Sequence, residues 1–494
     1  MKKLFTLLLL LTVCYVHAQK KVFKAVSEDI SSQFKPIYQD YALVGYVAFT
    51  QLEKISTDSF SYKITIMDEN LNDIGVVNLR DHKLILHGAR MEQDVLSLCY
   101  LKSNFYNNEF ANRQEYIDAI NNDRTSVFFQ FLNLNGKIIN TASLPVTLYH
   151  KVVPRNARIK DFYVDGGLKG PIQFLNVTGK GFAAFYRDDE KNSLVTLNTR
   201  GDIIWQKQIK EEAFALTLLT AGLDVYVLGY KAGNMLHRGY ELYGYNASDP
   251  SISSTLRMNH DDQGNRYHFS NFSVDPATGK AYISGYTVTD KKYLSYDDPD
   301  DFKNGSYAGL FTINIKDHVK GITTDVFSNW VDGSQSFITK DGHFKDETIF
   351  KHSNSFKDYN NATYHIGTAI LINGSKVTQK NTIIFKQDDK GNLTIDNSVE
   401  GDNTPSFKTG DEGLSANLKK YYTVTNPDTK TFYLIIDDKQ NIYIYNLNTK
   451  KVVRTISHID GNITTQVFPA KEGHVIVAEY NKKEKTTTVS IEAI

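Results

Sequence analysis

Short runs of alternating apolar and polar residues recur along this chain and end on similar phrases. Three clear examples are "DPATGKAYISGY" ending at Tyr286, "TAGLDVYVLGY" ending at Tyr230 and "NVTGKGFAAFY" ending at Tyr186. In each one, a short polar turn leads into an alternating run that favours a β-strand with one face buried. The repetition predicts that the chain builds many hairpins on one plan.

Eight runs of this kind can be found, each forming the second strand of a hairpin. They begin at Tyr41, Asp94, Gly181, Asp224, Lys280, Thr363, Thr431 and His474. A second hairpin follows most of them, as in "SLVTLNTRGDIIWQKQI" from Ser193, where "TRGD" supplies residues that tolerate a tight turn. Two hairpins per unit give four strands, repeated about eight times.

Chain length supports a repeat array. About 475 residues remain after a short leader, more than a single hydrophobic core holds, and no linker rich in Pro, Ser or Gly divides the chain. The chain therefore resembles the β-propeller superfamily, and we predict an all-β fold with one β-propeller of about eight four-stranded blades. Seven blades is the alternative because residues 333–362 are irregular, and a sandwich of two domains is a third interpretation.

The last repeat predicts how the ring closes. It offers only three strands, "TTQVF", "HVIVAEY" and "TTTVSIEAI", before the chain ends. The segment "KVFKAVS" from Lys21 to Ser27 precedes the first repeat and has the pattern of a strand. We expect this N-terminal strand to complete the last blade, because closure protects an otherwise open sheet edge.

A narrower resemblance rests on two short phrases. "DENLNDIG" from Asp68 to Gly75, after an N-terminal "VGYVAF", is similar to a family of exported Bacteroidota proteins with a propeller-like fold. The resemblance implies export and no particular activity.

The first residues predict a secretory signal peptide over residues 1–18, which leaves 19–494 as the propeller domain. Lys2 and Lys3 precede a ten-residue apolar run, and Ala18 provides a small residue at the cleavage site. That run is too short to cross a bilayer, and no later segment is longer. Val13 before Cys14 is too bulky for lipid attachment, so we expect a protein exported to the periplasm, cell surface or medium without an anchor.

Charge and cysteine content exclude several functions. Lys and Arg number 56, Asp and Glu also number 56, and the basic residues are scattered, so we expect no nucleic-acid or anionic-membrane partner. After cleavage Cys99 is the only cysteine, so no intrachain disulfide can form. It lies in an alternating apolar run, where we expect a buried, unreactive thiol.

The lengths of the connections predict where a function would lie. Turns within hairpins are short, whereas six long connections all join strands on what would be the opposite face. Long loops on a rigid scaffold commonly carry binding or catalysis, so we predict the working surface there. The six connections span residues 103–125, 145–171, 258–268, 287–306, 329–343 and 401–413. In the first, the spacing of Phe110, Ile117 and Ile120 predicts a short helix packed on a blade.

The connection "RMNHDDQGNRYHF" holds the densest polar cluster in the sequence. Its two histidines lack the spacing of a zinc site, and its oxygen-bearing residues imitate the start of a calcium loop but lack the bidentate Glu. Solvated turn residues are the plainer interpretation. The ligand-binding candidates taken from it are His260, Asp261, Asp262, Arg266 and His268.

Further candidates come from other connections. The acidic stretch "SYDDPDDFKNG" offers a weak Ca²⁺ site, or an acid and a base, although a solvated acidic loop is the plainer interpretation. Trp330 offers a stacking platform for a sugar or else packs inside, while Trp205 is expected to pack between blades. The residues are Asp297, Asp298, Asp300 and Asp301 for the metal, and Trp330, His237 and Arg238 for ligand binding.

Three classes of function follow. We favour a binding protein for a glycan, peptide or envelope protein that acts through the face with the long connections and needs no cofactor, with Ca²⁺ the one ion considered. The alternative is a hydrolase or lyase for extracellular carbohydrate that uses Asp261, Asp262, Asp297 or Asp298. A structural subunit of an envelope assembly is the third. No local motif for nucleophilic, zinc or nucleotide chemistry is present, but propeller enzymes assemble their sites from several blades.

Overall fold

A computed structural model describes most of the chain after residue 18. The described residues are 19–24, 32–39, 42–56, 59–105, 110–150, 166–168, 170–189, 191–209, 213–231, 239–258, 264–289, 307–330, 336–340, 342–373, 376–400, 407–408, 420–426, 430–438, 440–458 and 462–494. The predicted signal peptide and Cys14 lie outside them. No helix in this part of the chain is long and apolar enough to cross a membrane.

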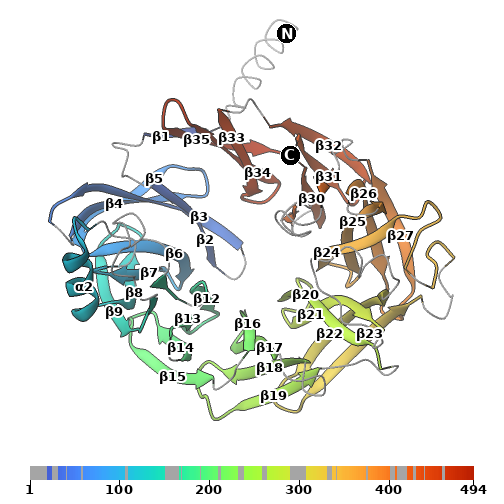
Figure 1. The fold of residues 1–494 in the computed structure, drawn as a ribbon, viewed down its shortest axis with the longest axis horizontal. Helices are drawn as coiled ribbons and strands as arrows, with labels where there is room; N and C mark the ends of the chain where they lie inside the picture. The colour runs from blue at the N-terminus through green and yellow to red at the C-terminus, as the bar shows by residue number, and fades with distance from the viewer. Residues whose placement is uncertain are drawn as a thin grey trace, which may run out of the picture.

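Eight groups of four antiparallel strands are arranged in a ring (Figure 1). The first group contains β2 (Ser32–Gln39), β3 (Ala42–Lys54), β4 (Phe60–Asp68) and β5 (Asp73–Asp81). The second contains β6 (Lys83–Glu92), β7 (Val95–Ser103), β8 (Ser126–Asn133) and β9 (Ile138–Pro145). The third contains β12 (Gln173–Val177), β13 (Gly181–Arg187), β14 (Asn192–Asn198) and β15 (Ile203–Ile209). The fourth contains β16 (Ala213–Ala221), β17 (Asp224–Lys231), β18 (Gly239–Asn246) and β19 (Ser253–Met258).

The remaining groups continue around the ring in chain order. The fifth contains β20 (Arg266–Val274), β21 (Ala281–Val288), β22 (Tyr307–Asp317) and β23 (Ile322–Asn329). The sixth contains β24 (Ile349–Lys357), β25 (Thr363–Asn373), β26 (Lys376–Gln387) and β27 (Leu393–Val399), with β28 (Phe407–Lys408) paired to β26. The seventh contains β29 (Lys420–Asn426), β30 (Thr431–Asp437), β31 (Asn441–Asn446) and β32 (Lys451–Ser457). The eighth contains β33 (Ile463–Pro469), β34 (His474–Asn481), β35 (Thr486–Ala493) and β1 (Gln19–Lys24).

This topology is an eight-bladed β-propeller, so the predicted fold is confirmed and neither seven blades nor a two-domain sandwich describes it. All eight predicted second strands occupy the second position of a blade. The first two blades share one sheet through a single parallel bridge between Tyr38 and Arg90. A separate two-stranded sheet pairs β10 (Tyr149–His150) with β11 (Gly166–Gly167).

The N-terminal strand closes the ring as predicted. β1 pairs antiparallel with β35 from Gln19↔Ile491 to Lys24↔Thr486, which makes it the outer strand of the eighth blade. In Figure 1 this blue strand lies beside the red strands of the C-terminus. The ring of Phe23 also lies 5.9 Å from that of Phe34 in the first blade. The two ends of the described chain are therefore joined non-covalently.

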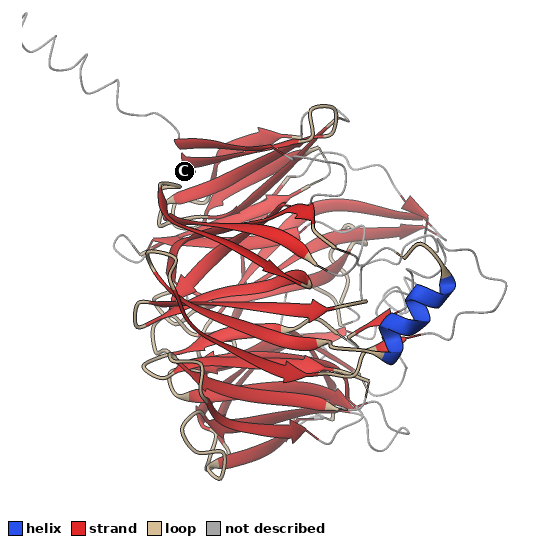
Figure 2. Ribbon diagram, turned by 90° about the vertical axis from the view of Figure 1, so that its left-hand side faces the viewer, coloured by secondary structure: helices blue, strands red, loops and turns tan. Residues whose placement is uncertain are grey.

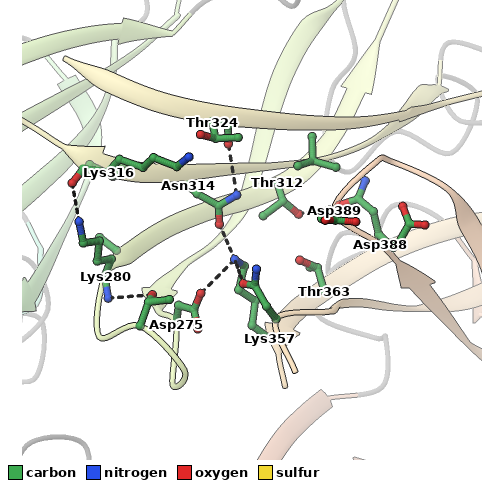
Figure 3. A pocket seen from close by; sticks show the side chains of 16 residues that line it. Asp275, Lys280, Thr312, Asn314, Lys316, Thr324, Lys357, Thr363, Asp388 and Asp389 are labelled. Carbon is green, nitrogen blue, oxygen red and sulfur yellow. Dashed lines mark hydrogen bonds and ion pairs between the residues drawn. The ribbon is translucent and has the colours of Figure 1, made fainter. Parts of the chain in front are cut away.

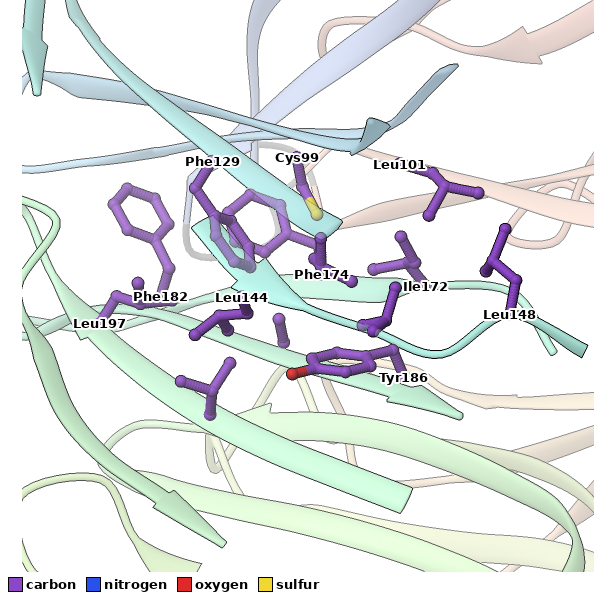
Figure 4. Close-up of a cluster of buried hydrophobic side chains, with 14 of the residues drawn as sticks. Cys99, Leu101, Phe129, Leu144, Leu148, Ile172, Phe174, Phe182, Tyr186 and Leu197 are labelled. Carbon is purple, nitrogen blue, oxygen red and sulfur yellow. The ribbon is translucent and has the colours of Figure 1, made fainter. Parts of the chain in front are cut away.

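Each blade buries apolar side chains against its neighbours, so the core is distributed around the ring. Between the second and third blades, the Phe174 ring lies 5.6 Å from Phe129 and 5.5 Å from Phe182 (Figure 4). Cys99 is fully buried in the same cluster, and burial raises the pKa of its thiol, as expected for an unreactive cysteine. Trp205 packs on Tyr245 of the next blade at 5.9 Å, as predicted.

The glycine in the recurring strand phrases has a steric explanation. A Cβ at Gly285 would lie 2.0 Å from the carbonyl oxygen of His268, and one at Gly367 would lie 2.2 Å from that of Lys351. Both glycines face inner strands at positions where the register shifts, between Phe269 and Asn271 in β20 and beside His352 in β24. Only glycine permits this close approach of backbone to backbone.

The connections differ in length between the two faces, as predicted. Within the hairpins, the turns between strands contain two to six residues, as in Gln93–Asp94 and residues 247–252. The long connections join strands on the other face, where helix α2 (Arg113–Asn121) projects (Figure 2). We call these the short-turn face and the long-connection face.

Helix α2 confirms the helix predicted in the first long connection, but the residues that it buries differ from those predicted. Asn112 caps its N-terminus by accepting a hydrogen bond from the Glu115 N–H. The buried residue of the helix is Tyr116, and Phe110 lies before the helix with its ring 5.5 Å from Tyr116. Ile120 packs against the same core cluster. The helix is thus a packing element of the second blade.

Candidate functional site

A polar pocket of about 490 Å³ lies between the fifth and sixth blades at the short-turn face (Figure 3). The residues come from the turns and strand ends of both blades. The lining comprises Asp275, Thr278, Lys280, Ala281, Thr312, Asn314, Ile315, Lys316, Thr324, Val326, Lys357, Asn361, Thr363, Gln387, Asp388 and Asp389. The volume is within the range of small-molecule sites.

A buried cation organises one wall of the pocket. Lys357, at the end of β24, places its Nζ 3.1 Å from the Asp275 carboxylate, and their side chains are only 3% and 5% exposed. The same ammonium donates to the side-chain oxygens of Asn361, at 3.1 Å, and of Asn314. Its three donors are thereby matched by three acceptors, and the ring of Tyr282 lies 5.3 Å from it. Such a buried charge requires this full set of partners.

The side-chain amide of Asn314 connects the hydrogen bonds around Lys357 to the fifth blade. Its oxygen accepts from Lys357, and its nitrogen donates to the Thr324 carbonyl at 3.2 Å. The pocket wall is therefore fixed before any ligand arrives, which lowers the entropic cost of binding.

Charged side chains of opposite sign line the two rims. On the fifth blade, Lys280 and Lys316 are exposed, and the Lys280 ammonium donates to the Lys316 carbonyl at 2.8 Å. On the sixth blade, Asp388 and Asp389 lie at the turn between β26 and β27. Figure 3 shows the carboxylates of this turn on the side of the pocket opposite the two lysines. The pocket thus offers both donors and acceptors.

The Asp388 carboxylate is held ionised by its turn. A hydrogen bond from the Asn392 side chain lowers the pKa of Asp388, and hydrogen bonds from the backbone N–H groups of Asn392 and Lys390 lower it further. Desolvation opposes these effects only in part. A carboxylate of this kind accepts hydrogen bonds and is a poor proton donor at neutral pH.

The floor of the pocket joins a buried polar network. Thr312 Oγ1 donates to Gln387 Oε1 at 2.8 Å, and Gln387 Nε2 donates to Ser328 Oγ at 2.7 Å. Ser328 in turn donates to the Gly391 carbonyl at 2.8 Å. These bonds fix the orientation of the Gln387 amide, so its oxygen faces Thr312.

Two of the predicted site residues lie on β20, at the inner edge of the fifth blade, away from this pocket. His268 stacks on Tyr286 with ring centroids 5.1 Å apart. Burial lowers the pKa of His268 to about 3, helped by the positive charges of Lys351 and Arg266, so the ring is neutral at physiological pH. Arg266 is half-buried on the same strand.

Trp330 does not form the predicted sugar platform. Its side chain is 1% exposed, and its indole N–H donates to the Tyr307 carbonyl at 2.9 Å. It lies in the core between the fifth and sixth blades with Tyr286 and Ile338. The sequence shows that Trp330 stands beside a long connection. It does not show that Trp330 packs in the core.

The other predicted residues lie outside the described part of the chain. These are His237, Arg238, His260, Asp261, Asp262, Asp297, Asp298, Asp300 and Asp301. The Ca²⁺ site and the carboxylates assigned to an acid and a base therefore remain predictions. Among the residues that are described, no three His, Cys, Asp or Glu side chains gather closely enough to hold a metal ion.

Sequence reasoning missed the pocket because its residues are far apart in the chain. The turns "DPATGK", "DYNNAT" and "DDKGN" were visible as turn sequences. Their convergence depends on how the fifth and sixth blades pack, which no local pattern contains. Lys357 gave no local signal either, because its strand, "IFKHSNSFK", carries several other polar residues.

Comparisons with known proteins identify neither a family nor a function for this chain. No family model matches the chain, and no curated protein matches it. Solved structures that resemble it include the Dos1 propeller, with 9% identity, coverage of 95% of this chain and 94% of that one, and a TM-score of 0.45. The polysaccharide lyase Uly1 has 13% identity, coverage of 95% and 91%, and a TM-score of 0.38.

A third similar structure is the WD40 domain of SCAP from fission yeast, with 9% identity, coverage of 94% and 98%, and a TM-score of 0.38. The low identities and TM-scores carry no functional argument. The β-propeller class rests on the strand topology itself, and the resemblance to an exported Bacteroidota family receives no support from a family model.

Proposed function

We propose that this protein is an exported binding protein that holds a hydroxyl-rich ligand, a short glycan, in the pocket between the fifth and sixth blades and does not cleave that ligand. The observation that carries the proposal is the preorganised polar wall around Lys357, with lysines on one rim and aspartates on the other. Sugar hydroxyls donate to carboxylates and accept from ammonium and amide groups, so one ligand can use both rims.

The lining favours recognition by hydrogen bonds. Amide, hydroxyl, ammonium and carboxylate groups supply most of its side chains, and no aromatic ring is among them. This proposal moves the ligand from the long-connection face, where the sequence analysis placed it, to the short-turn face. The reason is that the short-turn face presents a formed pocket with fixed partners.

The pocket supports binding better than glycoside hydrolysis. A glycosidase needs one carboxyl group with a raised pKa to act as the acid, opposite a second carboxylate. In the pocket the Asp388 pKa is lowered, and the Asp275 carboxylate is occupied by the buried Lys357. Asp388 is therefore not suited to donate a proton to a leaving group at neutral pH, and Asp275 is held in its ion pair with Lys357.

A glycan array followed by calorimetry tests the proposal. We expect a short glycan to bind the wild-type protein, and Lys316→Ala combined with Asp389→Ala to weaken binding about tenfold or more, because hydrogen bonds to charged groups are lost. Lys320→Ala is the matched control, since Lys320 is an exposed lysine outside the pocket lining.

Three results would contradict the proposal. The first is that no glycan binds, and the second is that a glycan binds but the double variant retains full affinity. The third is turnover of chromogenic glycosides that Asp→Asn variants abolish, which would establish the carbohydrate hydrolase or lyase instead.

A further inference from the structure

Two β-bulges bring side chains of neighbouring blades together at the inner edge of the ring. In β20 the register shifts between Phe269 and Asn271, which leaves Ser270 outside the regular ladder. In β24 it shifts between His352 and Asn354. Bulges redirect side chains and are common beside active sites. Here they place the Ser270 Oγ 2.7 Å from the His352 Nδ1, across the boundary between the fifth and sixth blades.

A continuous chain of hydrogen bonds continues from this pair into the sixth blade. His352 Nε2 lies 2.8 Å from Ser355 Oγ, and Ser355 Oγ lies 2.9 Å from His365 Nδ1. His365 Nε2 then lies 3.3 Å from the oxygen of Gln387. His352, Ser355 and His365 are 4%, 1% and 0% exposed, whereas Ser270 is exposed.

The orientation of the Gln387 amide determines which group donates in every hydrogen bond of this series. Its oxygen accepts from Thr312 and its nitrogen donates to Ser328, so His365 Nε2 must carry a proton and donate to that oxygen. His365 Nδ1 is then an acceptor, and the Ser355 hydroxyl donates to it.

The same reasoning gives the donor and the acceptor in the hydrogen bonds from Ser355 to His352 and from His352 to Ser270. Because the Ser355 hydroxyl proton is committed to His365, Ser355 Oγ accepts from His352 Nε2–H. His352 Nδ1 is therefore unprotonated and accepts from the Ser270 hydroxyl. In an activated serine nucleophile, the hydroxyl donates to a neutral imidazole, and a third group orients that imidazole. The pair of Ser270 and His352 has this arrangement.

Burial keeps both imidazoles of the chain neutral. Burial lowers the pKa of His352 well below its usual value, with the nearby His365 and Lys351 adding to the effect. Burial lowers the pKa of His365 to about 4, and its bond to Gln387 opposes that shift. Both imidazoles are therefore unprotonated at neutral pH, and the hydrogen-bonded chain connects His352 through Ser355 to His365.

We propose that Ser270 is a nucleophile that accepts acyl groups from small esters at the inner edge of the ring, with His352 as its general base. The Ser270 oxygen attacks the ester carbonyl carbon while its proton passes to His352 Nδ1. The bond from carbon to the alcohol oxygen then breaks, and the alcohol leaves with that proton. Water hydrolyses the acyl-serine to release the carboxylic acid and restore Ser270.

Ser355 and His365 are positioning residues in this relay. They hold His352 in the tautomer that leaves Nδ1 free to take the proton, the role that a carboxylate has in other serine nucleophile sites. None of the residues Ser270, His352, Ser355 and His365 lines the glycan pocket, although the hydrogen-bond chain ends on Gln387, which does.

Labelling of the full-length protein with a fluorophosphonate probe, read by peptide mass spectrometry, tests the proposal. We expect an adduct at Ser270 and none at Ser253, an exposed serine on β19 that serves as the internal control. With p-nitrophenyl acetate, His352→Gln should lower the acylation rate about 100-fold, the usual contribution of a general base. Ser355→Ala should lower it as well, and Ser355→Thr, which keeps the hydroxyl, should restore it.

The wild-type protein alone can overturn the proposal. If folded protein gives no Ser270 adduct, or labels Ser270 no faster than Ser253, Ser270 is not activated. A second measurement avoids variants that alter the buried chain: iodoacetamide should alkylate Ser270→Cys faster than Ser253→Cys at neutral pH. Equal rates would contradict base assistance at Ser270.

Discussion

The Lys357 ammonium lies 3.1 Å from the Asp275 carboxylate, and this almost fully buried pair joins the sixth blade to the fifth. Lys357 stands at the end of an inner strand, and Asp275 begins the turn between the first two strands of the neighbouring blade. The pair therefore fixes both the contact between the blades and one wall of the proposed ligand pocket.

Removing one partner of this pair should be costly. Lys357→Met leaves the Asp275 carboxylate buried without its cation, so we expect the free energy of unfolding to fall by about 3 to 5 kcal/mol. Denaturant unfolding measures the change. Lys320→Ala is the control, because solvent screens the exposed pair of Lys320 and Asp317 and the pair should contribute little to stability. A Lys357→Met protein as stable as the control would show that the pair is not structurally important.

Gly367→Ala should destabilise the sixth blade. The added Cβ would meet the Lys351 carbonyl oxygen at 2.2 Å and the Phe350 ring at 2.7 Å, so the strands must separate. We expect a loss of about 1 to 3 kcal/mol or more, read from the denaturation midpoint. Gly170→Ala, with nothing within 4 Å of its Cβ, should be neutral. Equal stability of the two variants would contradict the steric account of the recurring glycine.

Deletion of β1 should open the ring. Loss of the pairing from Gln19 to Lys24 with β35, together with the burial of Phe23, should lower the free energy of unfolding by about 2 to 4 kcal/mol. A synthetic peptide of sequence QKKVFK added to the truncated protein should raise the thermal midpoint again. An unchanged midpoint after deletion would mean that closure by this strand does not contribute to stability.

Acid should weaken the fold through His365. A histidine in the unfolded chain titrates near pH 6.5, whereas the pKa of His365 in the fold is about 4. As the pH falls between these values, the unfolded chain binds a proton that the folded protein does not. The contribution of His365 to the free energy of unfolding is fully present above pH 6.5. Between pH 6.5 and pH 4 the free energy of unfolding falls by about 3 kcal/mol.

Urea unfolding at several pH values checks this contribution. His365→Gln should be less sensitive to pH than the wild type between pH 6.5 and 4, because the titrating group is gone. The same pH dependence in both proteins would contradict a buried neutral His365.

The sequence predicted much of the architecture because blade formation depends on local patterns. The alternation before Tyr286 and Tyr230 marked second strands, and the three-strand last repeat pointed to β1 as its partner. Helix α2 was also predicted, although the pattern placed Phe110 and Ile117 on its buried face, whereas the buried residue of the helix is Tyr116.

The candidate sites were much harder to predict. Lys357 and Asp275 are 82 positions apart, and Ser270 and His352 are also 82 positions apart. Each pair meets only because adjacent blades pack face to face. Trp330 shows the same limit, because its neighbours in sequence left a surface platform and core packing both open, and only its neighbours in space place it in the core.

Hydrogen–deuterium exchange with and without a bound glycan tests the central claim most directly, because it locates the ligand on one face of the ring. The account predicts protection at the strand ends and turns around Asp275, Asn314, Lys357 and Asp388, on the short-turn face. Protection confined to the long connections, such as residues 103–125 and 258–268, would contradict it.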